Sequence, residues 1–136
     1  MPVERPAYCQ TALDAVDVRG LAEFYRQLLG LPYRPGDEPP AEGPDDADWL
    51  VLVGEGGVRL AFQKVDELTP TTWPSHEVPM QLHLDFTVPD MASLDGARDA
   101  ALELGAELIL DQRDDPEEAL YVLRDPAGHP FCVFVG

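Results

Sequence analysis

The chain has 136 residues, of which 45% are hydrophobic, and its 26 acidic residues against 9 basic ones give a formal net charge of −17. This length fits one globular domain with a hydrophobic core, because domains typically run to about 100–150 residues. The negative charge repels phosphate backbones and anionic lipid, and no apolar run reaches the roughly 20 residues that span a bilayer, so we expect neither nucleic acid nor a membrane as a partner.

The first half of the chain is predicted to hold a strand, a helix and a hairpin. Residues 7–14 are typical of a strand. Asp17 suits a helix N-cap, because its carboxylate can accept from the free N–H groups of a first turn, and Gly30 ends that helix. The apolar runs 49–53 and 58–65, joined by glycines, indicate a β-hairpin. The helix places these apolar residues on one face: Leu21, Phe24, Tyr25, Leu28 and Leu29.

The same order restarts after residues 69–79, which contain three prolines and indicate a linker. Asp90 is the expected N-cap of a second helix, and Gly105 ends it. The strands around this helix are expected over 81–88 and 106–110 and in a closing hairpin over 119–135.

An internal repeat relates the two halves. A shift of 73 residues places Asp17 on Asp90 and Gln10 on His83, and a shift of 71 residues superposes the two hairpins. We therefore predict an α+β fold in which two tandem βαβββ modules form a curved, partly closed mixed sheet around a cavity, with the helices on the outer face.

The modules are expected over about residues 5–68 and 80–136, joined by the linker at 69–79, within a single domain over 1–136. Each helix covers one sheet face and leaves the other open, so the open faces would line a ligand cavity. Alternation along the strands decides which side chains face it. The predicted inward-facing residues are Gln10, Ala12, Asp14, Arg59, Ala61, Gln63, Gln81, His83, Asp85, Cys132 and Phe134.

His83 is the strongest candidate for a functional group. It suits a metal ligand, a general base near neutral pH or a hydrogen-bond donor to a ligand, and the alternative is a buried histidine satisfied by Asp85 or by the backbone. Cys132 is a nucleophile if a nearby base or positive charge makes it a thiolate, and otherwise a small apolar lining residue. Trp49 forms either a cavity wall or part of the strand core.

Two further residues are expected to be structural. Cys9 should point to the helix side of its strand, in the core, and His129 should face solvent in the turn before Pro130. The N-terminus shows no apolar signal-peptide segment and the two cysteines do not suggest a disulfide framework, so we expect a reduced, cytoplasmic setting.

The sequence resembles the vicinal oxygen chelate superfamily, which includes glyoxalase I, the bleomycin-resistance proteins and the extradiol dioxygenases. The resemblance rests on the paired modules, on the stretch LDAVDVRGLAEFYRQLLGL, on HLDFTVPD and on the closing DPAGHPFCVF. It covers nearly the whole chain and is greatest to the small glyoxalase-like branch.

Metal-using members of that superfamily place ligands, often His and Glu, at equivalent strand positions of both modules. The resemblance puts those positions on Gln10, Ala61, His83 and Cys132, of which only His83 is a standard match. Ala61 has no donor, although Gln63 lies one step along the same face, and Cys132 is a soft ligand where the family supplies a hard carboxylate. We therefore expect no cofactor; a divalent ion, Zn, Ni, Fe or Mn, would use His83 with Gln10 and Cys132.

These residues predict a protein that binds a small, partly aromatic or oxygenated molecule in the concave sheet cavity, without the full metal-ligand set. The alternative is a metal-dependent lyase or dioxygenase that uses His83, and His83 with Asp85 would equally suit an enzyme that needs no metal. The resemblance also implies a homodimer, in which some members build the cavity from both chains. The expected ligand-binding residues are Gln10, Trp49, Gln63, His83, Cys132 and Phe134.

Overall fold

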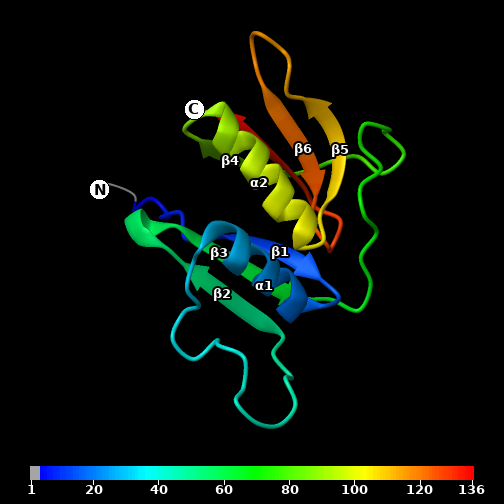
Figure 1. Cartoon of the computed structure of the whole chain (residues 1–136). Coiled ribbons are helices and arrows are strands. Elements are labelled where there is room, and N and C mark those ends of the chain that lie inside the picture. Colours follow the sequence, from blue (N-terminus) through cyan, green and yellow to red (C-terminus); the bar gives the residue numbers. More distant parts are fainter. Residues whose placement is uncertain (1–3) are drawn as a thin grey trace.

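A computed structural model describes residues 4–136 of the chain, and the strands of this part form two sheets (Figure 1). The first sheet has the order β1-β3-β2 and the second the order β4-β7-β6-β5. The first-sheet strands are β1 (Thr11–Ala15), β2 (Trp49–Val53) and β3 (Arg59–Lys64), with a short 3-10 turn, η1 (Glu55–Gly57), between β2 and β3. The second-sheet strands are β4 (Leu84–Val88), β5 (Glu107–Gln112), β6 (Leu120–Arg124) and β7 (Pro130–Val135).

The two sheets repeat one topology. In each, the opening strand pairs in parallel with the last strand of its half, β1 with β3 and β4 with β7, and the neighbouring strand pairs in antiparallel fashion. The helices α1 (Val18–Leu29) and α2 (Met91–Glu103) follow the two opening strands. This repetition confirms the predicted α+β fold of two tandem modules with mixed sheets.

The helix ends follow the capping signals in the sequence. The Asp17 carboxylate accepts a hydrogen bond from the Gly20 N–H at 2.9 Å, and the Asp90 carboxylate accepts one from the Ser93 N–H at 2.8 Å. After α1, Gly30 takes a φ of 67°, a left-handed conformation that favours glycine. Both predicted N-caps are therefore confirmed. No helix of the described chain is long and apolar enough to cross a bilayer.

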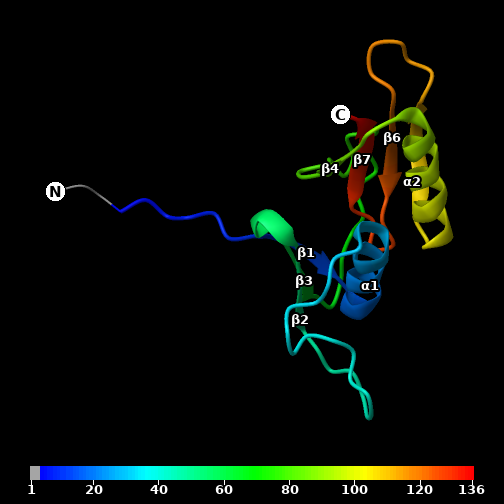
Figure 2. The ribbon, with the colours of Figure 1, turned by 60° about the vertical axis from the view of Figure 1, so that its left-hand side comes forward.

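One hydrophobic core joins the two modules. The Tyr25 ring of α1 stacks on Phe62 of the first sheet, with ring centroids 5.9 Å apart, and also meets Phe131 of the second sheet at 6.1 Å. Phe86 of β4 contacts both Tyr25 and Phe131. Both helices lie on the same side of the sheets (Figure 2), so the opposite faces of both sheets are left without a helix.

The single curved, partly closed sheet expected from the sequence is not what forms. β1 and β4 are edge strands of separate sheets, and no strand pairing joins them within residues 4–136. The strands also begin later than predicted, at Thr11 and Leu84, so residues 7–10 and 81–83 lie outside the ladders.

The first module also lacks the full strand that should follow its helix. Only an isolated bridge between Tyr33 and Leu52 stands there. Pro32 and Pro35 flank this position, and proline has no backbone N–H to donate to a ladder. Pairing is therefore limited to one residue, and the first sheet has three strands where the second has four.

Candidate functional site

Three of the predicted site residues come together on the open face of the second sheet. The parallel register pairs Asp85 of β4 with Cys132 of β7, and His83 lies two residues before Asp85. The His83 Nε2 lies 3.2 Å from Asp85 Oδ1, and one donor atom each from His83, Asp85 and Cys132 lie within 4.8 Å of one another. Sequence alternation therefore identified residues that are neighbours in the structure.

This cluster is accessible from solvent. The side chain of His83 is 38% exposed and that of Asp85 is 53% exposed. The sequence left open a buried histidine satisfied by Asp85. The structure shows the contact with Asp85, but His83 is not buried. An exposed imidazole held by a carboxylate is available to a ligand, a proton or a metal ion.

Cys132 is an unreactive thiol in this setting. Burial raises its pKa to about 11, and the carboxylates of Asp85 and Glu118 add to the shift. The thiol therefore stays protonated at neutral pH, and a nucleophilic role would need a thiolate. Of the two interpretations open from the sequence, the lining residue fits this environment.

An apolar strip lies beside the cluster. Cys132 pairs with Val122 of β6, and Phe134 pairs with Leu120, so these side chains share the open face. Phe134 also lines a cavity of about 630 Å³ at the end of the sheet. The other residues around that cavity are Gln112, Asp115, Glu117, Glu118, Ala119 and Val135.

The remaining predicted ligand-binding residues belong to the first module, Trp49 and Gln63 within its sheet and Gln10 just before β1. Trp49 pairs with Gln63 across β2 and β3, and Gln10 Oε1 accepts a hydrogen bond of 3.2 Å from Arg59 Nε. Within residues 4–136, no hydrogen bond or ion pair links Gln10, Trp49 or Gln63 to the His83 cluster. The predicted site is therefore divided between two sheets within one chain.

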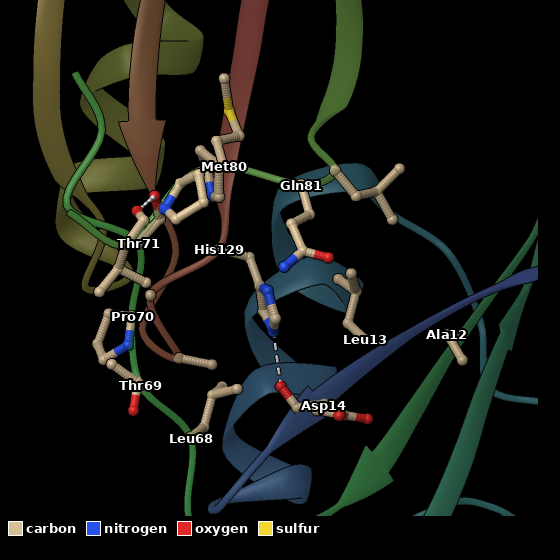
Figure 3. Close-up of a pocket in the computed structure, with 16 residues that line it drawn as sticks. Ala12, Leu13, Asp14, Leu68, Thr69, Pro70, Thr71, Met80, Gln81 and His129 are labelled. Atoms are coloured by element: carbon tan, nitrogen blue, oxygen red, sulfur yellow. Dashed lines mark hydrogen bonds between the residues drawn. The ribbon is translucent and has the colours of Figure 1, made fainter. Parts of the chain in front are cut away.

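A second cavity, of about 420 Å³, lies where the two modules meet (Figure 3). It is lined by β1, by the linker and by the turn before β7, through residues that include Leu13, Leu68, Met80, Gln81 and His129. None of the six predicted ligand-binding residues lines it. Ala12, Asp14 and Gln81, which were predicted to face a cavity, do line this one.

His129 is not the solvent-facing turn residue that the sequence indicated. Its ring nitrogen Nε2 lies 2.6 Å from the backbone oxygen of Asp14, across the junction between the modules (Figure 3). Cys9 also departs from expectation, because it is exposed and precedes β1 instead of packing in the core. The His129 contact has no local signal in the sequence, because it depends on how the modules dock. Cys9 is exposed because β1 begins only at Thr11.

Asp125 is a further residue that sequence reasoning missed. It is only 4% exposed, and one of its carboxylate oxygens accepts a 2.6 Å hydrogen bond from the Tyr25 hydroxyl. Its other oxygen accepts from the backbone N–H groups of Ala127 and His129. Burial raises the pKa of this carboxyl, against the opposing effect of these bonds. The only available signal was its place at the start of the DPAGH turn.

The metal set of the superfamily does not fit this chain. Ala61 is fully buried and offers no donor, and Gln10 is already bonded to a guanidinium, which repels a cation. His83 and Cys132 lie on the other sheet, in contact with Asp85. No four-ligand set shared by the two modules can be assembled from these residues, so we derive no step through such a metal.

The fold and the open sheet faces define the class, which is that of paired-module α+β proteins with the vicinal oxygen chelate fold. A family model described as a glyoxalase-like domain matches residues 10–134, and the chain belongs to this family. No curated protein sequence matches the chain.

Solved structures of this class superpose over almost the whole chain. A glyoxalase/bleomycin resistance protein/dioxygenase family enzyme from Burkholderia phytofirmans PsJN is 17% identical, with a TM-score of 0.70 over 93% of this chain and 96% of that one. The fosfomycin resistance protein FosX of Listeria monocytogenes is 14% identical, with a TM-score of 0.70 over 98% and 93%. A lactoylglutathione lyase from Agrobacterium tumefaciens is 22% identical, with a TM-score of 0.61 over 97% and 95%. At these identities the likeness concerns the fold alone.

Proposed function

We propose that the chain binds a small, partly aromatic or oxygenated molecule on the open face of its second sheet. The observation that carries this proposal is the convergence of His83, Asp85 and Cys132 on a sheet face that no helix covers. The half-buried Phe134 supplies apolar surface next to these polar groups. Small-molecule sites combine apolar walls with a few convergent polar groups in this way.

The charge of the chain favours neutral or cationic ligands over anionic ones. The formal net charge is −17, and Asp85 and Glu118 are the charged groups that act on the Cys132 thiol. A negative field lowers the local concentration of anions and raises that of cations. We therefore expect the ligand to carry hydroxyl, carbonyl or amine groups and no net negative charge.

A metal-dependent lyase or dioxygenase is the weaker alternative. Ala61 and Gln10 stand where the superfamily places ligands, and neither supplies an anionic oxygen. Proton-transfer catalysis without a metal is favoured by one observation, the 3.2 Å contact that holds the His83 ring against Asp85. An oriented imidazole with a carboxylate partner is a common general base. The Asp85→Asn variant tests this second function. Loss of turnover with ligand binding retained would support it.

A homodimer belongs to the same proposal. Tyr8 is 82% exposed and Leu82 is 56% exposed. Each lies just before an opening strand, in a segment that does not pair with either sheet. Large apolar side chains beside unpaired strand ends are what a second copy would cover. Sedimentation equilibrium tests this, and a monomer at every concentration would remove the second copy from the proposal.

A thermal-shift screen of aromatic and oxygenated compounds tests the ligand site, since a ligand that binds only the folded state raises the melting temperature. We expect hits with the wild type to be lost in His83→Ala. His76→Ala is the matched control, because His76 is an exposed linker residue. Hits that survive His83→Ala unchanged would place the ligand elsewhere, for example in the cavity beside His129.

A further inference from the structure

We propose that the cavity where the two modules meet is a second binding site, for a small uncharged alcohol or phenol. Its volume of about 420 Å³ lies within the range of about 300–1,000 Å³ that is usual for small-molecule pockets. The site goes beyond the proposed function, because neither Asp85 nor any of the six expected ligand-binding residues lines it. A ligand bound here would therefore leave the open face of the second sheet free.

The walls of this cavity are held in place by hydrogen bonds within the chain. The Asp125 carboxylate accepts a 3.0 Å bond from the backbone N–H of His129, which fixes the turn before β7. The Thr71 hydroxyl donates a 2.7 Å bond to the backbone oxygen of Val78, which joins the two stretches of the linker that line the cavity. The cavity is therefore preformed, and a ligand would not need to order its walls.

Much of the lining is apolar. Leu13 of β1 is only 4% exposed, and Leu68 and Met80 of the flanking segments are half-buried. Pro70 completes this part of the wall. Burial against such side chains stabilises an aromatic or aliphatic body, and a flexible methionine adapts to its shape. The ligand is therefore expected to be mainly apolar.

His129 supplies a hydrogen-bond acceptor inside the cavity, where its ring projects (Figure 3). The ring nitrogen Nε2 lies 2.6 Å from the backbone oxygen of Asp14. A carbonyl oxygen only accepts, so Nε2 carries the proton and Nδ1 of the neutral ring keeps a lone pair. Within residues 4–136, no group of the chain donates a hydrogen bond to Nδ1. A ligand with an O–H group could do so.

Gln81 supplies the complementary donor. Its side-chain amide also projects into the cavity (Figure 3), and it makes no hydrogen bond to another residue of the described chain. A hydroxyl group matches this pair, because its O–H donates to Nδ1 of His129 while its oxygen accepts from the Gln81 amide N–H. An alcohol or phenol satisfies both residues with one functional group.

The charges around the cavity exclude an ionised ligand. Asp14 and His129 are the ionisable residues among those of the described chain that line it, and no Lys or Arg does so. The Asp14 carboxylate points away from the His129 ring (Figure 3), so it is not placed to pair with a cation beside that ring. An anion has no counter-charge and is repelled by the net charge of −17. Burial of an unpaired charge is costly, so an uncharged ligand is favoured.

Titration of the ¹⁵N-labelled full chain with 2-naphthol tests the site by NMR. We expect saturable shifts of the backbone N–H signals of Leu13, Gln81 and Gly128, which line the cavity, while those of Asp85 and Cys132 stay in place. His83→Ala should leave this binding unchanged. The 2-naphthoate anion and the 2-naphthylmethylammonium cation keep the rings but carry a charge, and both should bind at least tenfold more weakly.

Matched variants identify the two polar contacts. The methyl ether 2-methoxynaphthalene has no O–H to donate, so the wild type should prefer 2-naphthol. His129→Phe should reduce that preference about two- to tenfold, the equivalent of one neutral hydrogen bond. Gln81→Met, at an exposed position, should weaken both compounds about equally, because the ether oxygen also accepts. His76→Phe changes an exposed linker histidine and is the matched control, and circular dichroism confirms that each variant is folded.

Several results would overturn this site: no saturable shift of the cavity N–H signals, naphthoate binding as tight as that of 2-naphthol, or an undiminished preference in folded His129→Phe. If His129→Phe does not fold, undiminished binding of both compounds to Gln81→Met has the same consequence. Shifts confined to Asp85 and Cys132 and lost in His83→Ala would place the compound on the open sheet face. That outcome would remove the junction site and support the proposed function, so the two proposals fail separately.

Discussion

The reactivity of each cysteine depends on where its side chain lies relative to the sheets. Cys132 lies between Phe131 and Val133, which face the helices, so its own side chain points to the open face. There it is half-buried next to carboxylates, and its pKa is raised to about 11. Cys9, the other cysteine, is exposed ahead of β1. The two thiols should therefore differ in reactivity.

We predict that iodoacetamide modifies Cys9 well before Cys132. A pKa of about 11 against the ordinary 9.0 lowers the thiolate fraction of Cys132 at neutral pH about 100-fold, and partial burial slows access further. Mass spectrometry of timed digests measures both rates in metal-free protein. Equal rates, or faster alkylation of Cys132, would contradict the protonated thiol, and urea-unfolded protein is the control in which the difference should vanish.

Asp125 leads to a prediction of pH dependence. Burial raises its folded pKa above the ordinary 3.8, so the folded state binds the proton more tightly than the unfolded state. Its contribution to stability is therefore greatest below about pH 4 and is lost as the pH rises through the folded pKa. We expect the unfolding free energy of the wild type, minus that of Asp125→Asn, to fall with rising pH across this window and then to level off.

Urea unfolding at a series of pH values measures that difference, and Asp66→Asn, at an exposed position, controls for the general charge effect. Tyr25→Phe tests the same contact at fixed pH. It leaves a buried carboxylate oxygen without its hydroxyl donor, which costs about 1–3 kcal/mol. A pH-independent difference for Asp125→Asn would show that the pKa of this carboxyl is not raised in the folded state.

At the scale of elements, the turn between β6 and β7 matters more than its length suggests. Gly128 has a φ of 99°, which favours glycine, and a Cβ placed there would lie 2.5 Å from the Cβ of Pro70 in the linker. The turn that carries Asp125 and His129 therefore packs tightly against the segment joining the modules. Gly96, inside α2, is the opposite case, because a Cβ there meets nothing within 4 Å.

We predict opposite signs for alanine at these two glycines. Gly128→Ala should lower the unfolding free energy by more than about 1 kcal/mol, through backbone strain and the clash with Pro70. Gly96→Ala should raise it by about 0.5–1 kcal/mol, because glycine disfavours a helix interior. Chemical denaturation of both variants measures the pair. A neutral Gly128→Ala would mean that the linker moves away at little cost.

At the scale of the whole molecule, the elements were predictable and their docking was not. Period and capping signals located both helices, the repeat supplied the topology, and strand alternation placed His83, Asp85 and Cys132 on one sheet face. Contacts between modules have no periodicity to reveal them. The bond from His129 to Asp14 and the one from Tyr25 to Asp125 each span about a hundred residues, so the sequence offered no sign of these contacts.

The shared aromatic core predicts that the modules unfold together. Phe131 belongs to the second module, is fully buried and packs on Phe24 and Tyr25 of the first module's helix. Phe131→Ala should therefore cost about 3–5 kcal/mol and destabilise both halves, because the cavity opens between them. In a Trp73→Phe background, the fluorescence of Trp49 reports on the first module alone, while circular dichroism reports on the whole chain. Coincident urea midpoints that shift together are expected; a Trp49 transition unmoved by Phe131→Ala would show two independently folding modules instead of the single domain that the sequence predicts.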